Sequence, residues 1–479
     1  MKNYKFVSLL KTFTKDEISK FDKFLDSPYF GIKPYTKPFY KELKKYYPSF
    51  DDTFSIEKIW TRVYADEVYN DTTVRKIMSL LAGYAEEFFK TEYSLAESTR
   101  RKIETAQIYV SKDLYNYAGK LLDEAESELL SSSTHDFELL TYLEGIRIYY
   151  NVQAVSQKQA APHVFTSARF SLLDFINKYS DSLYYAYMNR QRYNIDFSDN
   201  DMVRVMKMLD TSKLKDSASG SIYSVYYRIF YALRKIIIEN DKEYLNTFYN
   251  DYLHFEKTHS KKDSLHKTLS RKILRLLGNL AAFEPGFEKL WFEIRKTESE
   301  KNLLHTYISS FILRDYLVGI LPAFYIDEIN WAKKFADKYL QKMQPLQALD
   351  AKEFTDANIL YLEGKYDEAL KCTMKISAKD YQMGLLIKIL QLKIYYDKSD
   401  LEPAFGILDA YYHYVRENKY ISGEIENRHT PFADNFKKLL KAAGSGNKRI
   451  IEMSLHELNK INFFDKQWIV NRYNLLLKK

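Results

Sequence analysis

The sequence predicts an all-α protein, because it lacks the turn residues that β architectures need and repeats apolar residues at helical spacing. Its 479 residues include only 10 prolines and 14 glycines. A β-sandwich or barrel needs a turn signal about every 8–12 positions, which this chain cannot supply. Hydrophobic residues make up 46% of the chain, so there is ample apolar surface for a core and disorder is excluded.

The length favours several domains or a repeat array, since single hydrophobic cores stop growing at about 250–300 residues. Four of the prolines fall within the first fifty residues. We therefore divide the chain into a helical N-terminal module (1–95), a divergent array of helical hairpins (96–345), and helical repeats with a C-terminal cap (346–479). The later prolines are interpreted as helix ends: Pro162, Pro285, Pro345 and Pro431.

A capping box opens the N-terminal module. Thr14 and Glu17 are spaced so that each side chain satisfies the other's backbone amide at the start of a helix. Ser55 is placed to cap a later helix, and apolar spacing predicts four short helices around an aromatic core. The words SPYF (27–30) and YND (69–71), the latter followed by VRKIMSLL, are similar to the opening of a family of long, uncharacterised helical bacterial proteins. That resemblance implies no activity.

A helix–turn–helix pattern is clearest in ANILYLEGKYDEALKCTMKI (357–376). Gly364 stands at the turn, Tyr366 is placed to pack beneath it, and Ala369 lets the paired helices approach closely. Ala404 occupies the same place one unit later, at 404 − 369 = 35 positions. The segment resembles the tetratricopeptide repeat, whose period is about 34 residues. This resemblance implies a right-handed solenoid of helical hairpins.

The preceding region shows hairpins without a clean repeat motif. The expected helix pairs are 221–239 with 243–257, 264–282 with 286–298, and 302–321 with 326–343. Apolar residues recur there at helical spacing, but the small residues of the repeat do not recur at a fixed period.

Motifs for catalysis, metal binding or cofactor binding are missing from the sequence. It contains no HExxH, GxSxG, GxGxxG or CxxC. We interpret His254, His259 and His266 as solvated or capping residues, not as a metal site. The stretch 443–448 resembles a phosphate loop only faintly, and Gly444 is interpreted as the left-handed residue that ends a helix. We therefore expect no enzymatic activity, no metal and no cofactor.

Two basic clusters stand out in a chain whose formal net charge is +8. The first lies on one predicted helix and consists of Lys267, Arg271, Lys272 and Arg275. The second, near the C-terminus, contains Lys437, Lys438 and Lys441. Spacing at i, i+4 and i+8 predicts that the row formed by Lys267, Arg271 and Arg275 faces solvent or a partner. Such cations neutralise phosphates or meet an acidic protein; a merely solvated face is the competing interpretation.

A third candidate surface interleaves tyrosines and arginines between Tyr184 and Tyr193, and it includes Arg190 and Arg192. This composition is typical of stacking platforms for single-stranded nucleic acid. It is equally typical of interface hot spots. We favour a third interpretation, a buried helix whose two arginines reach the surface.

These features favour a non-enzymatic scaffold or adaptor that binds a peptide or helical segment of a partner protein along an extended helical surface. The alternative is a nucleic-acid-associated protein that uses the basic clusters. The opening MKNYKFVSLLKTF lacks a signal-peptide core, and the longest uncharged apolar stretch, 316–326, is too short to span a bilayer. With Cys372 as the single cysteine, we predict a cytoplasmic protein without a membrane partner, and leave its oligomeric state open.

Overall fold

The computed structural model describes residues 4–48, 50, 54–65, 67–154, 156–193, 200–209, 221–259, 264–282, 284–304, 312–377, 381–418, 421, 423–445, 447–458, 461 and 463–478. Helix covers 83% of these residues and none of them belongs to a β-strand. The predicted all-α class is therefore confirmed.

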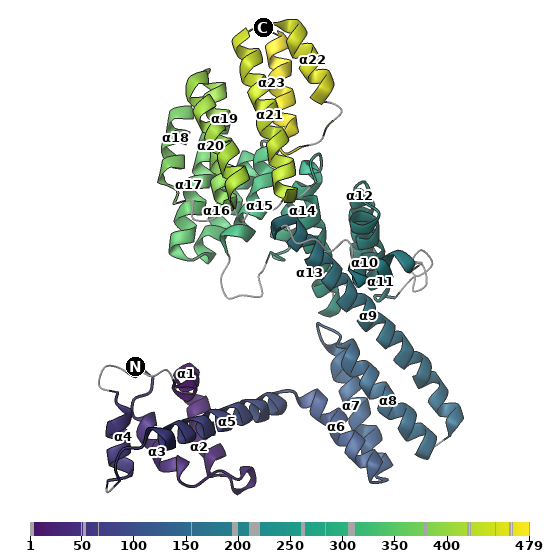
Figure 1. Cartoon of the computed structure of the whole chain (residues 1–479). Coiled ribbons are helices and arrows are strands. Elements are labelled where there is room, and N and C mark those ends of the chain that lie inside the picture. Colours follow the sequence, from purple (N-terminus) through teal and green to yellow (C-terminus); the bar gives the residue numbers. More distant parts are fainter. Residues whose placement is uncertain are drawn as a thin grey trace. The chain divides into compact units, whose positions relative to one another are not determined.

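The helices follow one another along the chain (Figure 1). In the first part of the chain they are α1 (Lys5–Thr12), α2 (Lys15–Asp26), η1 (Pro28–Phe30), α3 (Thr36–Lys44), α4 (Ile56–Val63), α5 (Asp71–Ala96), α6 (Ser98–Ser111), α7 (Tyr115–Ser131), α8 (Phe137–Ala154), α9 (Gln157–Tyr193), α10 (Asp201–Met208), α11 (Ser224–Leu233) and the π-helical segment η2 (Arg234–Ile238). They continue with α12 (Tyr244–Thr258), α13 (Ser264–Ala281), α14 (Glu288–Glu300), α15 (Leu313–Tyr325), α16 (Ile329–Tyr339), η3 (Leu340–Lys342), α17 (Pro345–Leu362), α18 (Tyr366–Lys375), α19 (Tyr381–Asp397), α20 (Leu401–Glu417), α21 (Gly423–Ser445), α22 (Lys448–Leu458) and α23 (Lys466–Lys478).

The chain forms two compact units. Unit 1 comprises Met1–Leu129 and Tyr142–Val164, and unit 2 comprises Leu130–Thr141 and Phe165–Lys479. Helices α8 and α9 each contribute residues to both units. The finer divisions expected at residues 95 and 345 stay predictions.

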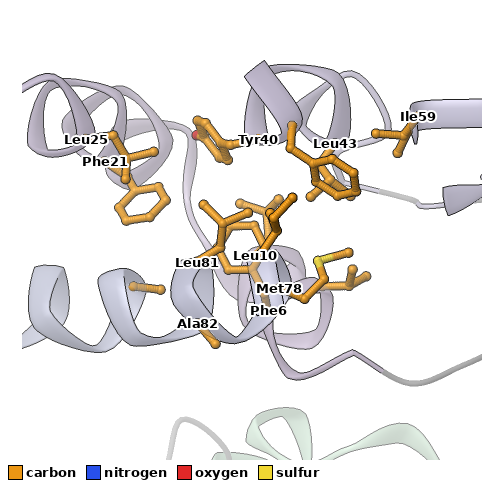
Figure 2. Packing of buried hydrophobic residues seen from close by; sticks show 14 of the residues in the cluster. Phe6, Leu10, Phe21, Leu25, Tyr40, Leu43, Ile59, Met78, Leu81 and Ala82 are labelled. Carbon is orange, nitrogen blue, oxygen red and sulfur yellow. The ribbon is translucent and has the colours of Figure 1, made fainter. Parts of the chain in front are cut away.

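The first five α-helices of unit 1 enclose an aromatic core. Helix α5 packs against α1, α2 and α3, and α3 packs against α4. Phe21 is fully buried, with the rings of Tyr40 and Phe88 each centred 5.3 Å from its own. Figure 2 shows Phe21, Tyr40 and Leu81 in this core. Edge-to-face ring pairs of this kind add about 0.5–1.5 kcal/mol each beyond the burial of apolar area.

The helix starts predicted for this region form as expected. The backbone N–H of Glu17 donates to Thr14 Oγ1 at 3.2 Å, and the Thr14 N–H donates to Glu17 Oε2 at 2.6 Å. Ser55 Oγ accepts from the N–H of Lys58 at 3.4 Å. Each side-chain cap stabilises its helix by about 1 kcal/mol because it pairs an amide that the helix itself leaves unpaired.

Successive helices of unit 2 pack as neighbours along the chain. Each helix from α11 to α21 contacts the next, and α17 also contacts α15 and α19; Figure 1 shows α17 to α20 lying side by side. Two of the three predicted helix pairs appear as α11 with α12 and α13 with α14. The third appears as α15 with α16, but α15 begins at Leu313 and residues 302–304, which were predicted to be helical, are not. Residues 305–311, within the third pair, lie outside the described residues.

Five turns among the described residues share one backbone geometry. In each, a residue with positive φ follows a helix, and the next backbone N–H donates to the carbonyl five residues back, as in a Schellman cap. The positive-φ residues are Asp113, Asn302, Asp327, Gly364 and Ser399. The last two are 399 − 364 = 35 positions apart, which equals the spacing of Ala369 and Ala404. The hairpin α17–α18 and the hairpin α19–α20 therefore turn in the same way at the same period.

The residues expected to build these hairpins take the predicted places. Gly364 has a φ of 77° in the turn, where L residues other than Asn and Asp are strained. Ala369 and Ala404 are fully buried. Tyr366 is half-buried, and its ring centre lies 6.0 Å from that of Tyr361 on α17. Local turn chemistry and small-residue spacing thus located both hairpins.

The structure contradicts the predicted helix ends at two prolines and at one glycine. Pro162 lies inside α9 and Pro431 inside α21, because a proline ring tolerates helical φ and costs each helix one hydrogen bond while the surrounding turns continue. Gly444 lies in the last turn of α21 and is not among the glycines with positive φ. It is part of the helix that it was expected to end.

Candidate functional site

The C-terminal cluster of cations lies on the exposed side of α21 and at the start of α22. Lys437, Lys438 and Lys441 are exposed, as are Lys448 and Arg449. Residues 436–450 contain no acidic side chain. We call these five cations the C-terminal basic face. Because its positive charges are concentrated on two adjacent helices, this face attracts acidic groups more strongly than a single exposed lysine does.

An exposed apolar pair borders this face. Ile450 and Met453 on α22 are 48% and 60% exposed. Ile450, Met453 and Glu457 are spaced at i, i+3 and i+7 and therefore lie in one row along α22. The ammonium of Lys438 on α21 lies 3.3 Å from Glu457 Oε2. This ion pair places the α21 cations beside Ile450 and Met453. The combination of apolar side chains with flanking cations is what an acidic amphipathic segment requires.

The opposite sides of these helices hold the face in place. Phe436 and Leu440 of α21 are buried in one hydrophobic cluster with Ile451 and Leu458 of α22. Helix α23 packs against both α21 and α22 and adds Tyr473 to the same cluster. The exposure of Ile450 and Met453 is therefore a property of a packed three-helix arrangement, in which α22 buries its other side.

The other predicted basic row differs from expectation. Lys267 is exposed, but Arg271 and Arg275 are half-buried. One guanidinium nitrogen of Arg275, Nη2, donates to the hydroxyl of Tyr185 on α9 at 2.8 Å. The physical reason is that α9 packs over the polar side of α13, which the sequence pattern predicted to face solvent. The expected exposure of this row is wrong for two of its three members.

Lys272 makes the same connection between α13 and α9. Its ammonium lies 2.8 Å from Asp181 Oδ1 and donates to Asn177 Oδ1 at 2.6 Å. Burial lowers the pKa of Lys272, against the opposing effect of the Asp181 carboxylate. Since Lys272 and Arg275 already bind groups on α9, this cluster holds two helices together and offers few cations to a partner.

The tyrosine- and arginine-rich segment at the end of α9 is buried in part. Tyr184 and Tyr187 are 3% and 5% exposed, and Tyr187 donates to Glu284 Oε1 at 3.0 Å. Arg190 is half-buried, and the side chain of Arg192 lies outside the described residues. The structure thus buries the rings of Tyr184 and Tyr187, whereas Tyr185 of the same segment is 52% exposed; the interpretation of the two arginines stays a prediction.

A group of buried ionisable side chains with perturbed pKa values lies around Asp465 in unit 2. Burial raises the pKa of Asp465, whose carboxylate pairs with Lys393. Burial lowers the pKa of His429 to about 3, and its Nδ1 lies 2.5 Å from the hydroxyl of Tyr411. Perturbed groups of this kind are common in active sites. The adjoining pocket, however, has a volume of about 40 Å³, against about 300–1,000 Å³ for pockets that hold small-molecule ligands. This space is therefore much smaller than a typical substrate pocket.

Among the described residues, no three His, Cys, Asp or Glu side chains are arranged to hold a metal ion. No helix in the described part of the chain has the length and apolar character to cross a membrane. Burial raises the pKa of the Cys372 thiol, as expected for an unreactive cysteine in a helix.

Comparison with known proteins adds no relative: no family model, curated protein or solved structure matches the chain.

Proposed function

We propose that this chain is a non-enzymatic scaffold of the tetratricopeptide-like solenoid class, and that its C-terminal basic face binds an acidic, amphipathic helical segment of a partner protein. The fold assignment is supported by neighbour-to-neighbour packing from α11 to α21 and by two Schellman turns 35 positions apart. Stacked helical hairpins of this kind carry binding surfaces without a catalytic pocket. The protein acts in the cytoplasm without a cofactor.

The observation that carries this function is the placement of Ile450 and Met453 beside exposed lysines. Full burial of a fully exposed apolar side chain of this size contributes about 1.5–3 kcal/mol. Since Ile450 and Met453 are 48% and 60% exposed, each has about half of that to gain in an interface. The flanking cations contribute chiefly to association rate and partner choice, since exposed ion pairs are worth about 0–1 kcal/mol each. A partner helix with apolar residues on one side and carboxylates at its edges therefore fits this face.

The test uses fluorescence anisotropy with the full chain and a labelled helical peptide that has leucines along one side and glutamates at the flanks. A peptide of the same composition in scrambled order is the ligand control. We compare the wild type with Lys437→Glu/Lys438→Glu/Lys441→Glu. The matched control reverses three exposed lysines elsewhere in unit 2, Lys289, Lys334 and Lys371. The face variant should weaken binding at least ~10-fold, and the control variant by less than ~2-fold. Equal effects of the two variants would contradict the proposal.

The same cations would also neutralise phosphates, which keeps nucleic acid as the competing ligand. A labelled single-stranded oligonucleotide in the same assay separates the two. The variant Ile450→Ser/Met453→Ser should weaken peptide binding while leaving oligonucleotide binding unchanged, because only the peptide buries these side chains. Oligonucleotide binding tighter than peptide binding, with a steep loss of affinity on adding salt, would favour the nucleic-acid function.

A further inference from the structure

Helix α9 is apolar on two sides along the part that belongs to unit 2, which begins at Phe165. One side is buried in the protein, where Phe170, Leu173 and Ile176 are 6%, 0% and 1% exposed. An amphipathic surface helix has only one such apolar stripe. On α9 a second stripe, which we call the α9 row, consists of four exposed residues: Phe165, Ala168, Leu172 and Phe175. The described part of the chain therefore leaves apolar area on this helix uncovered.

The members of the α9 row are separated by three, four and three positions. This is the seven-residue pattern of a helix that pairs lengthwise with another helix, because it keeps the side chains in one narrow seam. The row lies on a single continuous helix. Phe175 is backed by Tyr179, whose ring centre lies 5.1 Å from its own. A second helix that lies along the row therefore contacts all four residues.

The exposed fractions show how much area the row offers. Phe165 is 76% exposed, Phe175 42% and Leu172 38%. An aromatic side chain buries about 150–250 Å² when it is fully covered, so the two rings together offer about 180–300 Å² on each copy of the chain. Two copies then bury about 360–600 Å² through these rings, against about 1,200–2,000 Å² for a stable interface. This area predicts a weak, reversible dimer.

The charges beside the row suit a second copy of this chain better than a partner with charges of one sign. Lys178 has its ammonium 2.9 Å from Asp174 Oδ2 and 2.8 Å from Glu138 Oε2. The guanidinium of Arg169 lies 5.1 Å from the ring centre of Tyr223, so this cation is turned towards the start of α11. The four charged groups carry no net charge. In a two-fold interface a face meets itself, and a face without net charge is not repelled by its own copy.

The order of large and small residues in the row fits an antiparallel pair. The spacing of three, four and three reads the same in both directions and is symmetric about position 170. Two antiparallel copies that cross there place Phe165 against Phe175 of the second copy, and Ala168 against Leu172 of the second copy. The leucine then fills the space above the alanine, as a knob fills a hole. A parallel pair would place Ala168 against itself and leave a gap.

We infer that the α9 row is a self-association site, at which α9 of one copy pairs in antiparallel orientation with α9 of a second copy. The inference concerns α9 alone and is independent of the function proposed for the C-terminal basic face. That face carries five cations and would repel its own copy, so the two surfaces serve different contacts.

Sedimentation velocity of the full chain tests the inference at concentrations from about 1 to 200 µM, where a dimer of small buried area dissociates. The wild type should show a weight-average mass that rises from that of one chain towards that of two. Phe165→Glu/Phe175→Glu should raise the dimer dissociation constant at least ~10-fold, since it places carboxylates in an apolar contact. The matched control is Leu346→Glu/Leu349→Glu on α17, whose side chains are 81% and 54% exposed. It should change the dissociation constant less than ~2-fold.

Cysteine cross-linking tests the orientation of the pair. Phe165→Cys and Phe175→Cys are prepared as separate chains, one of them with a size tag, and are mixed in equal amounts under mild oxidation. An antiparallel pair brings position 165 of one copy next to position 175 of the other, within the short distance that a disulfide requires. The mixed disulfide should therefore exceed the products that link two copies of one variant. The native Cys372 is buried and should not react.

The inference is overturned if the wild type remains a single chain up to about 200 µM. It is also overturned if Phe165→Glu/Phe175→Glu, with a wild-type circular dichroism spectrum, dimerises as tightly as the wild type. Should that variant fail to fold, the decision passes to cross-linking, where self-linked products equal to or above the mixed disulfide would overturn the antiparallel pair. Lys437→Glu/Lys438→Glu/Lys441→Glu should dimerise like the wild type; loss of the dimer in that variant would place the contact on the C-terminal basic face and refute the role of α9.

Discussion

The turn at Gly364 allows a quantitative test of the hairpin geometry. Its φ of 77° lies in the left-handed region, yet a methyl group built at this position meets no atom within 4 Å. The cost of Gly364→Ala is therefore conformational and not steric. An L residue in this region loses about 1–2 kcal/mol, while the lower entropy of the unfolded alanine chain returns about 0.4–1 kcal/mol. We expect a net loss of about 1 kcal/mol.

The same substitution elsewhere should have the opposite sign. Gly406 lies in the interior of α20, is exposed, and also has open space around its missing methyl group. Gly406→Ala should stabilise the chain by about 0.5–1 kcal/mol, because alanine is the better helix former. At the equivalent turn, Ser399 has a φ of 61°, so Ser399→Gly should stabilise or leave stability unchanged.

The assay is urea unfolding followed by far-ultraviolet circular dichroism, supported by hydrogen exchange of the α18 amides. Gly364→Ala should lower the urea midpoint and speed exchange in α18, and Gly364→Asn should do so less, since asparagine tolerates this conformation. Gly364→Val should be the most destabilising. If Gly364→Ala and Gly406→Ala shift the midpoint in the same direction, the left-handed turn does not constrain this hairpin in solution.

Two further predictions concern packing and protonation in unit 2. Ala369→Trp should lower the free energy of unfolding by about 1–3 kcal/mol, because Ala369 is fully buried where α18 meets its neighbours; an unchanged urea midpoint would contradict this packing. His429 has a pKa lowered to about 3 by burial, so the unfolded chain binds a proton there that the folded chain does not. Below pH 6.5 its contribution to stability should fall by about 1.4 kcal/mol per pH unit, and His429→Gln should flatten this part of the stability curve; an unchanged slope would refute the assignment.

The sequence could predict features whose interacting residues lie close together along the chain, and could not predict contacts between distant segments. The caps at Thr14 and Ser55 and the turn at Gly364 depend on residues within a few positions, so spacing alone located them. Arg275 could not be placed in this way. Its partner Tyr185 is 90 positions away on α9, and helical periodicity identifies the polar side of α13 without showing that another helix covers it.

The pocket between α11 and α12 was missed for a related reason, because the residues that line it come from two helices and no local motif joins them. His259 was assigned a solvated or capping role, and its Nδ1 lies 3.4 Å from the carbonyl oxygen of Phe255. The C-terminal basic face was identified from charge alone, whereas the exposure of Met453 beside it required the structure.

The ion pair between Lys393 and Asp465 gives the last prediction. Lys393 of α19 is 9% exposed, and its ammonium lies 5.8 Å from the ring centre of Tyr325 on α15 and 5.5 Å from that of Trp468 on α23. This one cation therefore connects three helices. Lys393→Met should lower the free energy of unfolding by about 3–5 kcal/mol at pH 7, because it leaves a buried carboxylate uncompensated.

The pH dependence of that loss separates charge burial from lost packing. In Lys393→Met, the folded-state pKa of Asp465 lies above its unfolded value of about 3.9, so the penalty is largest above the folded pKa and disappears as pH falls towards the unfolded one. Asp465→Asn tolerates the positive φ at this position and, combined with Lys393→Met, should restore much of the stability at pH 7. Lys352→Met breaks the exposed pair with Asp356 and should cost less than about 1 kcal/mol. A loss in Lys393→Met that is the same at pH 4 and pH 7, and that Asp465→Asn does not relieve, would mean that lost contacts with Tyr325 and Trp468 dominate the effect, not the buried charge.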